Sequence, residues 1–229
     1  MRINEIERID PEDWEGGKQA LNKGMPVIKN AKKLPGSSGL LYSIDQGETR
    51  GVIDIALWDP AKKPMYKGAP GMEVGRLELI ELPRFEIPGA VAVSTITVDE
   101  DYRGQGLSTA MYKIVLKRLM RPLVAGDAQT PGGRRNWVSI ANIPGVQIKG
   151  YARLEEDDLM DKDNIDVIMG KLGGEISHNE RSGDYFVTFD VMPSTTGQEL
   201  EAYIKTNLSK VYDEPIGMLT GLYAQWTGE

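Results

Sequence analysis

Apolar and polar residues alternate along much of the first half of the chain, a pattern typical of strands that bury one face. Together with short apolar runs, this pattern predicts strands at 39–45, 50–59, 72–83, 90–98 and 122–127. The turn-rich QGET between the first two is typical of a hairpin connection. The strand predicted at 72–83 has apolar residues at both parities, so we expect it to be buried, at least in part, on both faces.

The hydrophobic period changes to that of a helix after residue 106. One apolar stripe follows the spacing i, i+3, i+4, i+7, i+8 and i+12, and it consists of Leu107, Ala110, Met111, Ile114, Val115 and Leu119. Pro122 is expected to end this helix. A second helix is predicted to start with Thr130 as its N-cap and Pro131 at its first position, and to run through RRNWVSIA.

The remaining third of the chain predicts two more strands, at 146–154 and 183–191, and a helix opened by a capping box of Thr196 and Glu199. Strands and helices are interleaved, and several hairpin signals are antiparallel. We therefore predict the α/β class, with a mixed, mostly antiparallel central sheet and flanking helices. We expect one domain over residues 1–229, in which 1–38 form an N-terminal extension or first helix region and 155–229 complete the fold.

Composition narrows the function classes. The absence of cysteine among 229 residues excludes disulfides and a cysteine nucleophile. A net charge of −7 argues against nucleic acid as the main partner, since phosphate neutralisation needs clustered Lys and Arg. No apolar stretch has the length of a signal peptide or membrane helix, so we expect a cytoplasmic protein without a membrane partner. The single histidine, His178, lies in SHNERSG, which is typical of an exposed turn and disfavours a histidine-based triad.

An acidic run at 155–166 raises the question of calcium binding. Asp161 and Asp163 begin a spacing similar to that of an EF-hand loop. Asp166, however, stands where the turn glycine is required, and Leu172 stands where the last bidentate Glu is required. The run is better interpreted as the acidic first turn of a helix, and we predict no metal site.

The segment Arg103-Gly104-Gln105-Gly106-Leu107-Ser108 connects a predicted strand to a predicted helix. Backbone N–H groups in the first helical turn have no partner within the helix, and glycines let an anion approach the backbone. This arrangement favours a phosphate site, to which an arginine adds a charge-assisted contact. The Walker pattern is absent, and the Rossmann pattern lacks its third glycine at Thr109. A structural turn without a ligand is the alternative.

With its flanks, ITVDEDYRGQGLS, the segment resembles the signature of the GNAT superfamily of N-acetyltransferases. That signature reads Gln or Arg, two residues, Gly, one residue, then Gly or Ala, and here Ser108 stands at the last position. The resemblance is specific over 90–121 and extends with weaker motifs over about 39–154. The arrangement around Trp137 and IPGV is also similar to a group of viral GNAT-like sequences.

The resemblance implies acetyl-CoA as the acetyl donor and a small-molecule or protein amine as the acceptor. It assigns the backbone of Ile96, Thr97 and Val98 to the pantetheine arm, with the amide near Ile96 polarising the thioester carbonyl. It assigns the pyrophosphate to the signature loop, that is, to Arg103, Gly104, Gln105, Gly106, Leu107 and Ser108.

A general base is needed because the amine must be neutral to attack. Glu78, Glu81 and Glu86 are the candidates, and strand parity places Glu78 and Glu81 on opposite faces unless a bulge intervenes. The tyrosine that the family uses as general acid is not evident. Trp137 is interpreted as a core residue, and Tyr151 is a poor positional match.

Two other functions remain open on the sequence alone. One hypothesis, motivated by Ser108 and the missing tyrosine, is that the chain keeps the GNAT scaffold without catalysis and binds a protein partner. The other hypothesis is a nucleotide- or phosphate-binding domain of another kind. For the enzyme, the acidic balance favours a cationic acceptor such as a polyamine, an aminoglycoside or a protein lysine.

Overall fold

The computed structural model describes most of the chain between residues 28 and 228. The described residues are 28, 30–46, 51–82, 87–125, 131–154, 174–178, 185–193 and 220–228, with single positions at 195, 199, 202 and 206. They group into two compact units, and β2, β3 and β4 contribute residues to both. Each unit is described by itself, and the single domain expected over 1–229 stays a prediction.

The first unit contains β1 (Lys32–Lys33), most of β2 (Leu41–Gln46) and the second half of β3 (Val52–Asp59). β1 pairs antiparallel with the start of β2. Three consecutive residues of β3, Ala56 to Trp58, are buried, so this strand is covered on both faces. The buried indole N–H of Trp58 donates to the Ser43 hydroxyl at 3.0 Å, which satisfies both polar groups inside the core.

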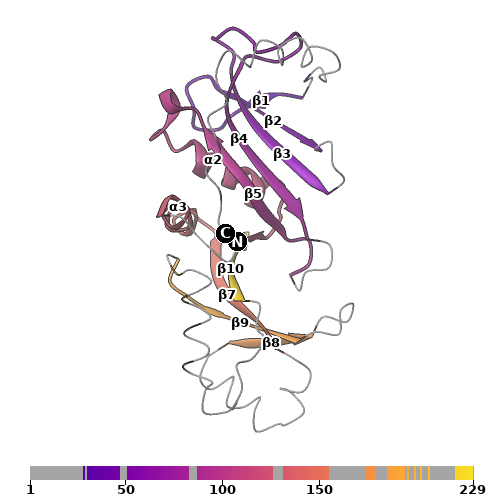
Figure 1. Cartoon of the computed structure of the whole chain (residues 1–229), viewed down its shortest axis with the longest axis vertical. Coiled ribbons are helices and arrows are strands. Elements are labelled where there is room, and N and C mark those ends of the chain that lie inside the picture. Colours follow the sequence, from indigo (N-terminus) through magenta and orange to yellow (C-terminus); the bar gives the residue numbers. More distant parts are fainter. Residues whose placement is uncertain are drawn as a thin grey trace, which may run out of the picture. The chain divides into compact units, whose positions relative to one another are not determined.

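The second unit is built on seven hydrogen-bonded strands in the order β4-β5-β6-β10-β7-β9-β8 (Figure 1). Their bounds are β4 Met72–Glu81, β5 Val91–Val98, β6 Leu123–Val124, β7 Val146–Leu154, β8 Glu175–His178, β9 Tyr185–Asp190 and β10 Thr220–Trp226. The β5–β6 pair is parallel and the others are antiparallel. The predicted class is therefore confirmed as α/β with a mixed, mostly antiparallel sheet.

Helices pack on this sheet where the sequence predicts them. α2 (Leu107–Lys113) continues without a break into a π-helical segment, η3 (Ile114–Arg118), and together they contact β5 and β10. α3 (Pro131–Ala141) packs against α2 and β7. The predicted apolar stripe faces inward, and Met111 and Val115 are fully buried. The helical run ends before Met120, which has a left-handed φ of 50°, two residues ahead of Pro122.

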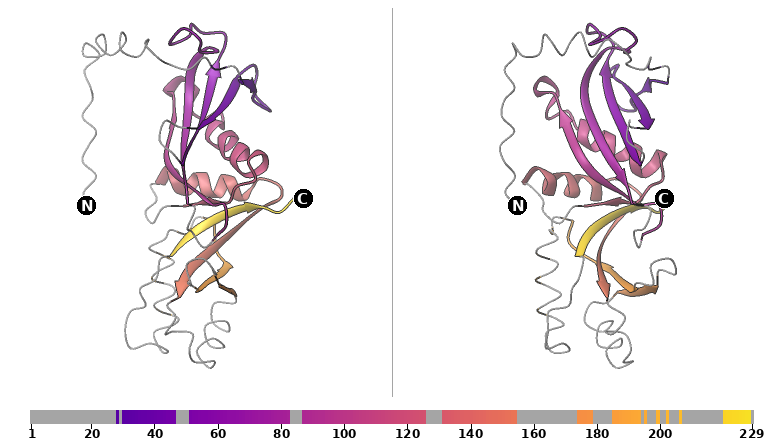
Figure 2. Two further views of the ribbon diagram at one scale, coloured as in Figure 1. Left: turned by 90° about the vertical axis from the view of Figure 1, so that its right-hand side faces the viewer. Right: turned by 45° about the vertical axis from the view of Figure 1, so that its right-hand side comes forward.

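The last described strand, β10, lies between β6 and β7 and is antiparallel to both (Figure 2). The sequence pattern did not predict β10 or the edge strand β8. The interpretation of His178 as a turn residue is wrong, because it ends β8 and its ring lies 4.5 Å from that of its cross-strand partner Tyr185. The QGET connection, the run at 155–166 and Thr196 of the capping box lie outside the described residues.

Candidate functional site

An acidic turn joins β5 to the glycine loop. Asp99 caps the short 3-10 helix η2 (Glu100–Tyr102), and its carboxylate accepts the backbone N–H of Asp101 at 3.0 Å. The carbonyl of Asp99 accepts the N–H of Tyr102, again at 3.0 Å. The Tyr102 side chain is buried and anchors the turn. The hydrogen bonds of this turn and the burial of Tyr102 thus hold the start of the glycine loop next to the end of β5.

Both glycines of the loop have left-handed backbone conformations, with φ of 78° at Gly104 and 75° at Gly106. Any other residue is strained there by about 1–2 kcal/mol. A Cβ added at either position meets no atom within 4 Å, so the space over the loop is open. Gly106 is the N-cap of α2, and its carbonyl accepts the first helical bond, from Ala110 at 3.0 Å. The N–H groups of the first turn are therefore available to a ligand in that space.

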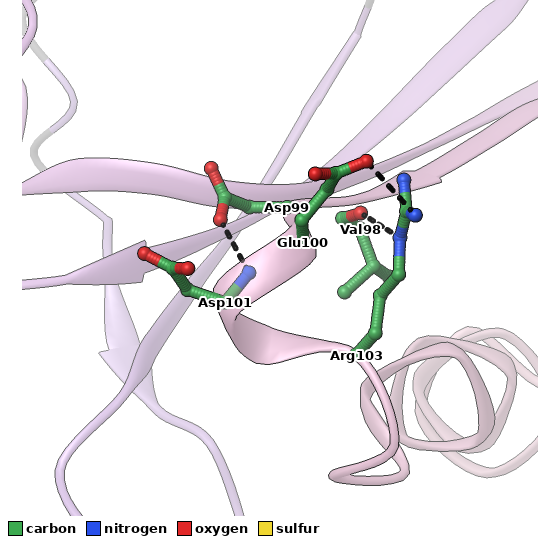
Figure 3. A network of polar contacts seen from close by, with 5 residues as sticks. All are labelled: Val98, Asp99, Glu100, Asp101 and Arg103. Atoms are coloured by element: carbon green, nitrogen blue, oxygen red, sulfur yellow. Dashed lines mark hydrogen bonds and ion pairs between the residues drawn. The ribbon is translucent and has the colours of Figure 1, made fainter.

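The side chain of Arg103 reaches back to Val98, the last residue of β5 (Figure 3). Its Nε donates to the carbonyl oxygen of Val98 at 3.3 Å, and its Nη1 lies 3.2 Å from the Glu100 carboxylate. Gln105 donates through its side-chain amide to the Asp101 carbonyl at 3.3 Å. Both long side chains of the signature thus bind the acidic turn, which the sequence pattern did not predict.

The three residues assigned to the pantetheine arm all lie on β5. Ile96, Thr97 and Val98 pair on one side with β4. On the other side, β5 pairs with β6 only at Val91 and Ala92. Within the described part of the chain, 93–98 therefore has no strand partner on that side. Its backbone groups are available to an extended ligand, and they lead directly to the glycine loop.

A β-bulge interrupts the pairing of β4 with β5. Glu78 is opposite Thr95, whereas the next residue, Leu79, is opposite Val93, so Ser94 is the extra residue. Because the insertion is on β5, the alternation along β4 is unbroken, and Glu78 and Glu81 keep opposite faces as predicted from parity. The bulge also lies where the parallel partner of β5 has ended.

The two candidate bases have different surroundings. Glu81 forms an ion pair with Arg121 at 3.0 Å, and the Arg121 Nε also donates to the Gly89 carbonyl. This ion pair therefore links β4 to the segments that precede β5 and β6. Glu78 lies directly across from the bulge and is half-buried, and its carboxylate forms no hydrogen bond or ion pair with the described residues. Glu86 lies outside the described residues.

Two tyrosines that pack against the sheet, Tyr112 and Tyr151, are buried. Tyr112 of α2 is buried and hydrogen-bonded to the Asn136 side chain of α3, and burial raises the pKa of Tyr112 to about 12. Tyr151 belongs to a small core under the sheet, with Ile87, Ala90, Val124 and Tyr223. Trp137 is buried, which confirms it as a core residue. Ser139 donates to the Arg135 carbonyl of its own helix at 3.0 Å.

The raised pKa of Tyr112 gives a stability prediction. The unfolded chain releases the phenol proton near pH 10, whereas the folded chain holds it to about pH 12. The contribution of Tyr112 to the free energy of unfolding is complete below pH 10. It falls by about 2–3 kcal/mol as pH rises from 10 to 12. Urea unfolding at pH 9 and pH 11.5 should show a steeper loss of stability for the wild type than for Tyr112→Phe. Equal losses would contradict this assignment.

Comparisons with known proteins give little further guidance. No protein-family model matches the sequence, and no curated protein matches it. Among solved structures, the chain is similar to a GNAT-family protein from Bacteroides thetaiotaomicron that bears the name acetyltransferase. The identity is 10%, the TM-score is 0.29, and the match covers 89% of this chain and 93% of the other. A TM-score of this size does not establish a shared fold, and the resemblance to viral sequences stays a prediction.

One further observation concerns membranes. Among the described helices, none combines the length and the apolar character needed to cross a bilayer.

Proposed function

We propose that the chain is an acetyl-CoA-dependent N-acetyltransferase that modifies a primary amine. The observation that carries the proposal is the open side of β5. Parallel pairing with β6 stops at Ala92, and 93–98, which has no strand partner on that side within the described part of the chain, runs directly into a glycine loop that has open space over Gly104 and Gly106. An extended arm that ends in a pyrophosphate fits this sequence of features, because strand-like pairing holds the arm and free N–H groups hold the anion.

The residues present fit such a donor. The backbone of Ile96, Thr97 and Val98 supports pairing with the amides of a pantetheine arm. The N–H groups of Leu107 and Ser108, in the first turn of α2, support the pyrophosphate, together with the neighbouring loop residues Gly104, Gln105 and Gly106. Serine at position 108 is small enough for close approach. When bound, acetyl-CoA supplies an acetyl thioester whose carbonyl carbon is open to attack by an amine.

Glu78 is the carboxylate that the structure favours as general base. It lies opposite the bulge at Ser94, on the face that Glu81 does not share. It takes a proton from the amine through a bridging water, so the C–N bond forms from a neutral nucleophile. As the amide forms, the C–S bond breaks and the nitrogen loses its second proton, which neutralises the departing thiolate to give the CoA thiol. Glu81 has a structural role, because its carboxylate is paired with Arg121.

Calorimetric titration with acetyl-CoA and with CoA tests the proposal. We expect micromolar binding of both, followed by CoA release when polyamines, an aminoglycoside or a lysine peptide are added as acceptors. No binding in a folded sample free of CoA would contradict it. Binding without release of CoA to any acceptor would favour the second candidate, a non-catalytic protein of the same scaffold. That candidate is favoured by one feature of the site, since α3 carries Trp137 and Ser139 and no tyrosine.

A further inference from the structure

The Glu100 carboxylate lies against the guanidinium of Arg103, the residue that directly precedes the glycine loop. The distance from Arg103 Nη1 to Glu100 Oε1 is 3.2 Å, and both side chains are exposed, at 65% for Arg103 and 84% for Glu100 (Figure 3). A carboxylate and a phosphate present the same kind of anionic oxygens to a guanidinium. The Glu100 carboxylate thus makes the same contact with Arg103 that a bound phosphate would make.

We infer that Glu100 is a built-in competitor for the anion site, and that a bound anion takes its place on Arg103. This inference rests on the anion site of the proposed function. Exposed ion pairs are weak, so exchange of one anion for another on this arginine costs little. The affinity for the donor then depends on how much more strongly the guanidinium binds the donor's phosphate than the Glu100 carboxylate.

The contact with β5 explains why Glu100 is the group that leaves. Arg103 uses its Nε to donate to the carbonyl of Val98, the last residue of the strand. A guanidinium has five N–H donors, so those on the terminal nitrogens can bind a phosphate while Nε keeps its place. Glu100 is the first residue of η2, and its side chain extends into solvent. It can rotate away without disturbing the backbone of the turn.

The chain offers a matched control at the neighbouring acidic position. Asp101 has the same charge as Glu100 and is one residue away, but its carboxylate points away from the guanidinium of Arg103 (Figure 3). Its backbone N–H and carbonyl hold the turn through Asp99 and Gln105, and those bonds do not involve the Asp101 side chain. Asp101→Asn therefore removes a negative charge near the loop without removing a competitor.

The experiment is a double-mutant cycle of Glu100→Gln and Arg103→Gln, with CoA and inorganic pyrophosphate as probes in calorimetry at low salt. We expect Glu100→Gln to tighten binding about fivefold, the equivalent of a full surface pair. Asp101→Asn should tighten it less than about twofold, since solvent and salt screen its charge. In the Arg103→Gln background, Glu100→Gln should have no larger effect than Asp101→Asn.

An equal gain from Glu100→Gln in both backgrounds would overturn the inference, because Glu100 would then act only as a nearby charge. Weaker binding by Glu100→Gln would also overturn it, since the pair would then support the loop. Absence of binding of either probe to any variant would overturn it as well. Binding of pyrophosphate without CoA, with the cycle as expected, would sustain the competitor and contradict the proposed acetyltransferase.

Discussion

Replacing Gly106 with tryptophan should abolish the stabilisation of the protein by acetyl-CoA. The open space over this glycine is where the proposed ligand approaches the backbone, and an indole would fill it. At a ligand concentration of 100 times Kd, binding stabilises the wild type by about 2.7 kcal/mol. Loss of binding removes that whole shift, and we expect Kd to rise by about 100-fold or more, as judged by thermal unfolding with and without ligand.

Gly36 provides the control for this substitution. Its φ is 78°, close to the 75° of Gly106, and a Cβ there also meets no atom within 4 Å. It lies in the turn between β1 and β2, in the other compact unit. Gly36→Trp carries the same backbone strain and the same added bulk, so it should lower the unligated Tm similarly and keep the ligand shift. Retention of the shift in Gly106→Trp would show that no ligand occupies this loop.

The strand, loop and helix that build the site could be predicted because their signals are local. The alternation over 90–98 and the helical period from Leu107 depend only on neighbouring residues, and the observed bounds differ from the predicted ones by a residue or so. Left-handed conformations at Gly104 and Gly106 also follow from glycine itself. The β7 strand, predicted at 146–154, has those bounds in the structure.

The features that define the chemistry are not local, and the sequence did not predict them. The early end of the β5–β6 pairing and the bulge at Ser94 are properties of register between strands, which periodicity along one strand does not contain. β10 was missed because its alternation is short and interrupted by Gly221, and because its partners β6 and β7 lie far back in the chain. Its burial is supplied by those neighbours, with Leu222 and Ala224 fully inaccessible.

Side-chain partners decide between candidates that the sequence leaves equal. Parity alone gave Glu78 and Glu81 the same standing as bases. Arg121 lies 40 residues after Glu81, and no short-range pattern predicts their ion pair, which favours a structural role for Glu81. The same reasoning changes the interpretation of Arg103, whose partners are Val98 and Glu100. In both cases the sequence suggests a functional role from the charge of the residue alone, whereas the structure shows which group that charge contacts.

This difference between the two carboxylates leads to the second large effect. Glu78→Gln should lower kcat for acetyl transfer by about 10²–10⁴-fold, the usual contribution of a general base. Because Gln cannot accept the proton, the defect should shrink as pH is raised and more of the amine becomes neutral in solution. Affinity for acetyl-CoA should stay within about twofold, since Glu78 is opposite Thr95 and apart from the glycine loop.

Glu81→Gln is the matched substitution, with the same change of charge three residues along the same strand. It breaks the ion pair that links Glu81 to Arg121, so its effect should fall on stability, by about 1 kcal/mol for a half-exposed pair, and kcat should change less than about threefold. The two variants should therefore differ in what they change: Glu78→Gln lowers the rate of acetyl transfer, and Glu81→Gln lowers the free energy of unfolding. A rate defect confined to Glu81→Gln would reverse the assignment, because the carboxylate paired with arginine would then be the group that moves the proton.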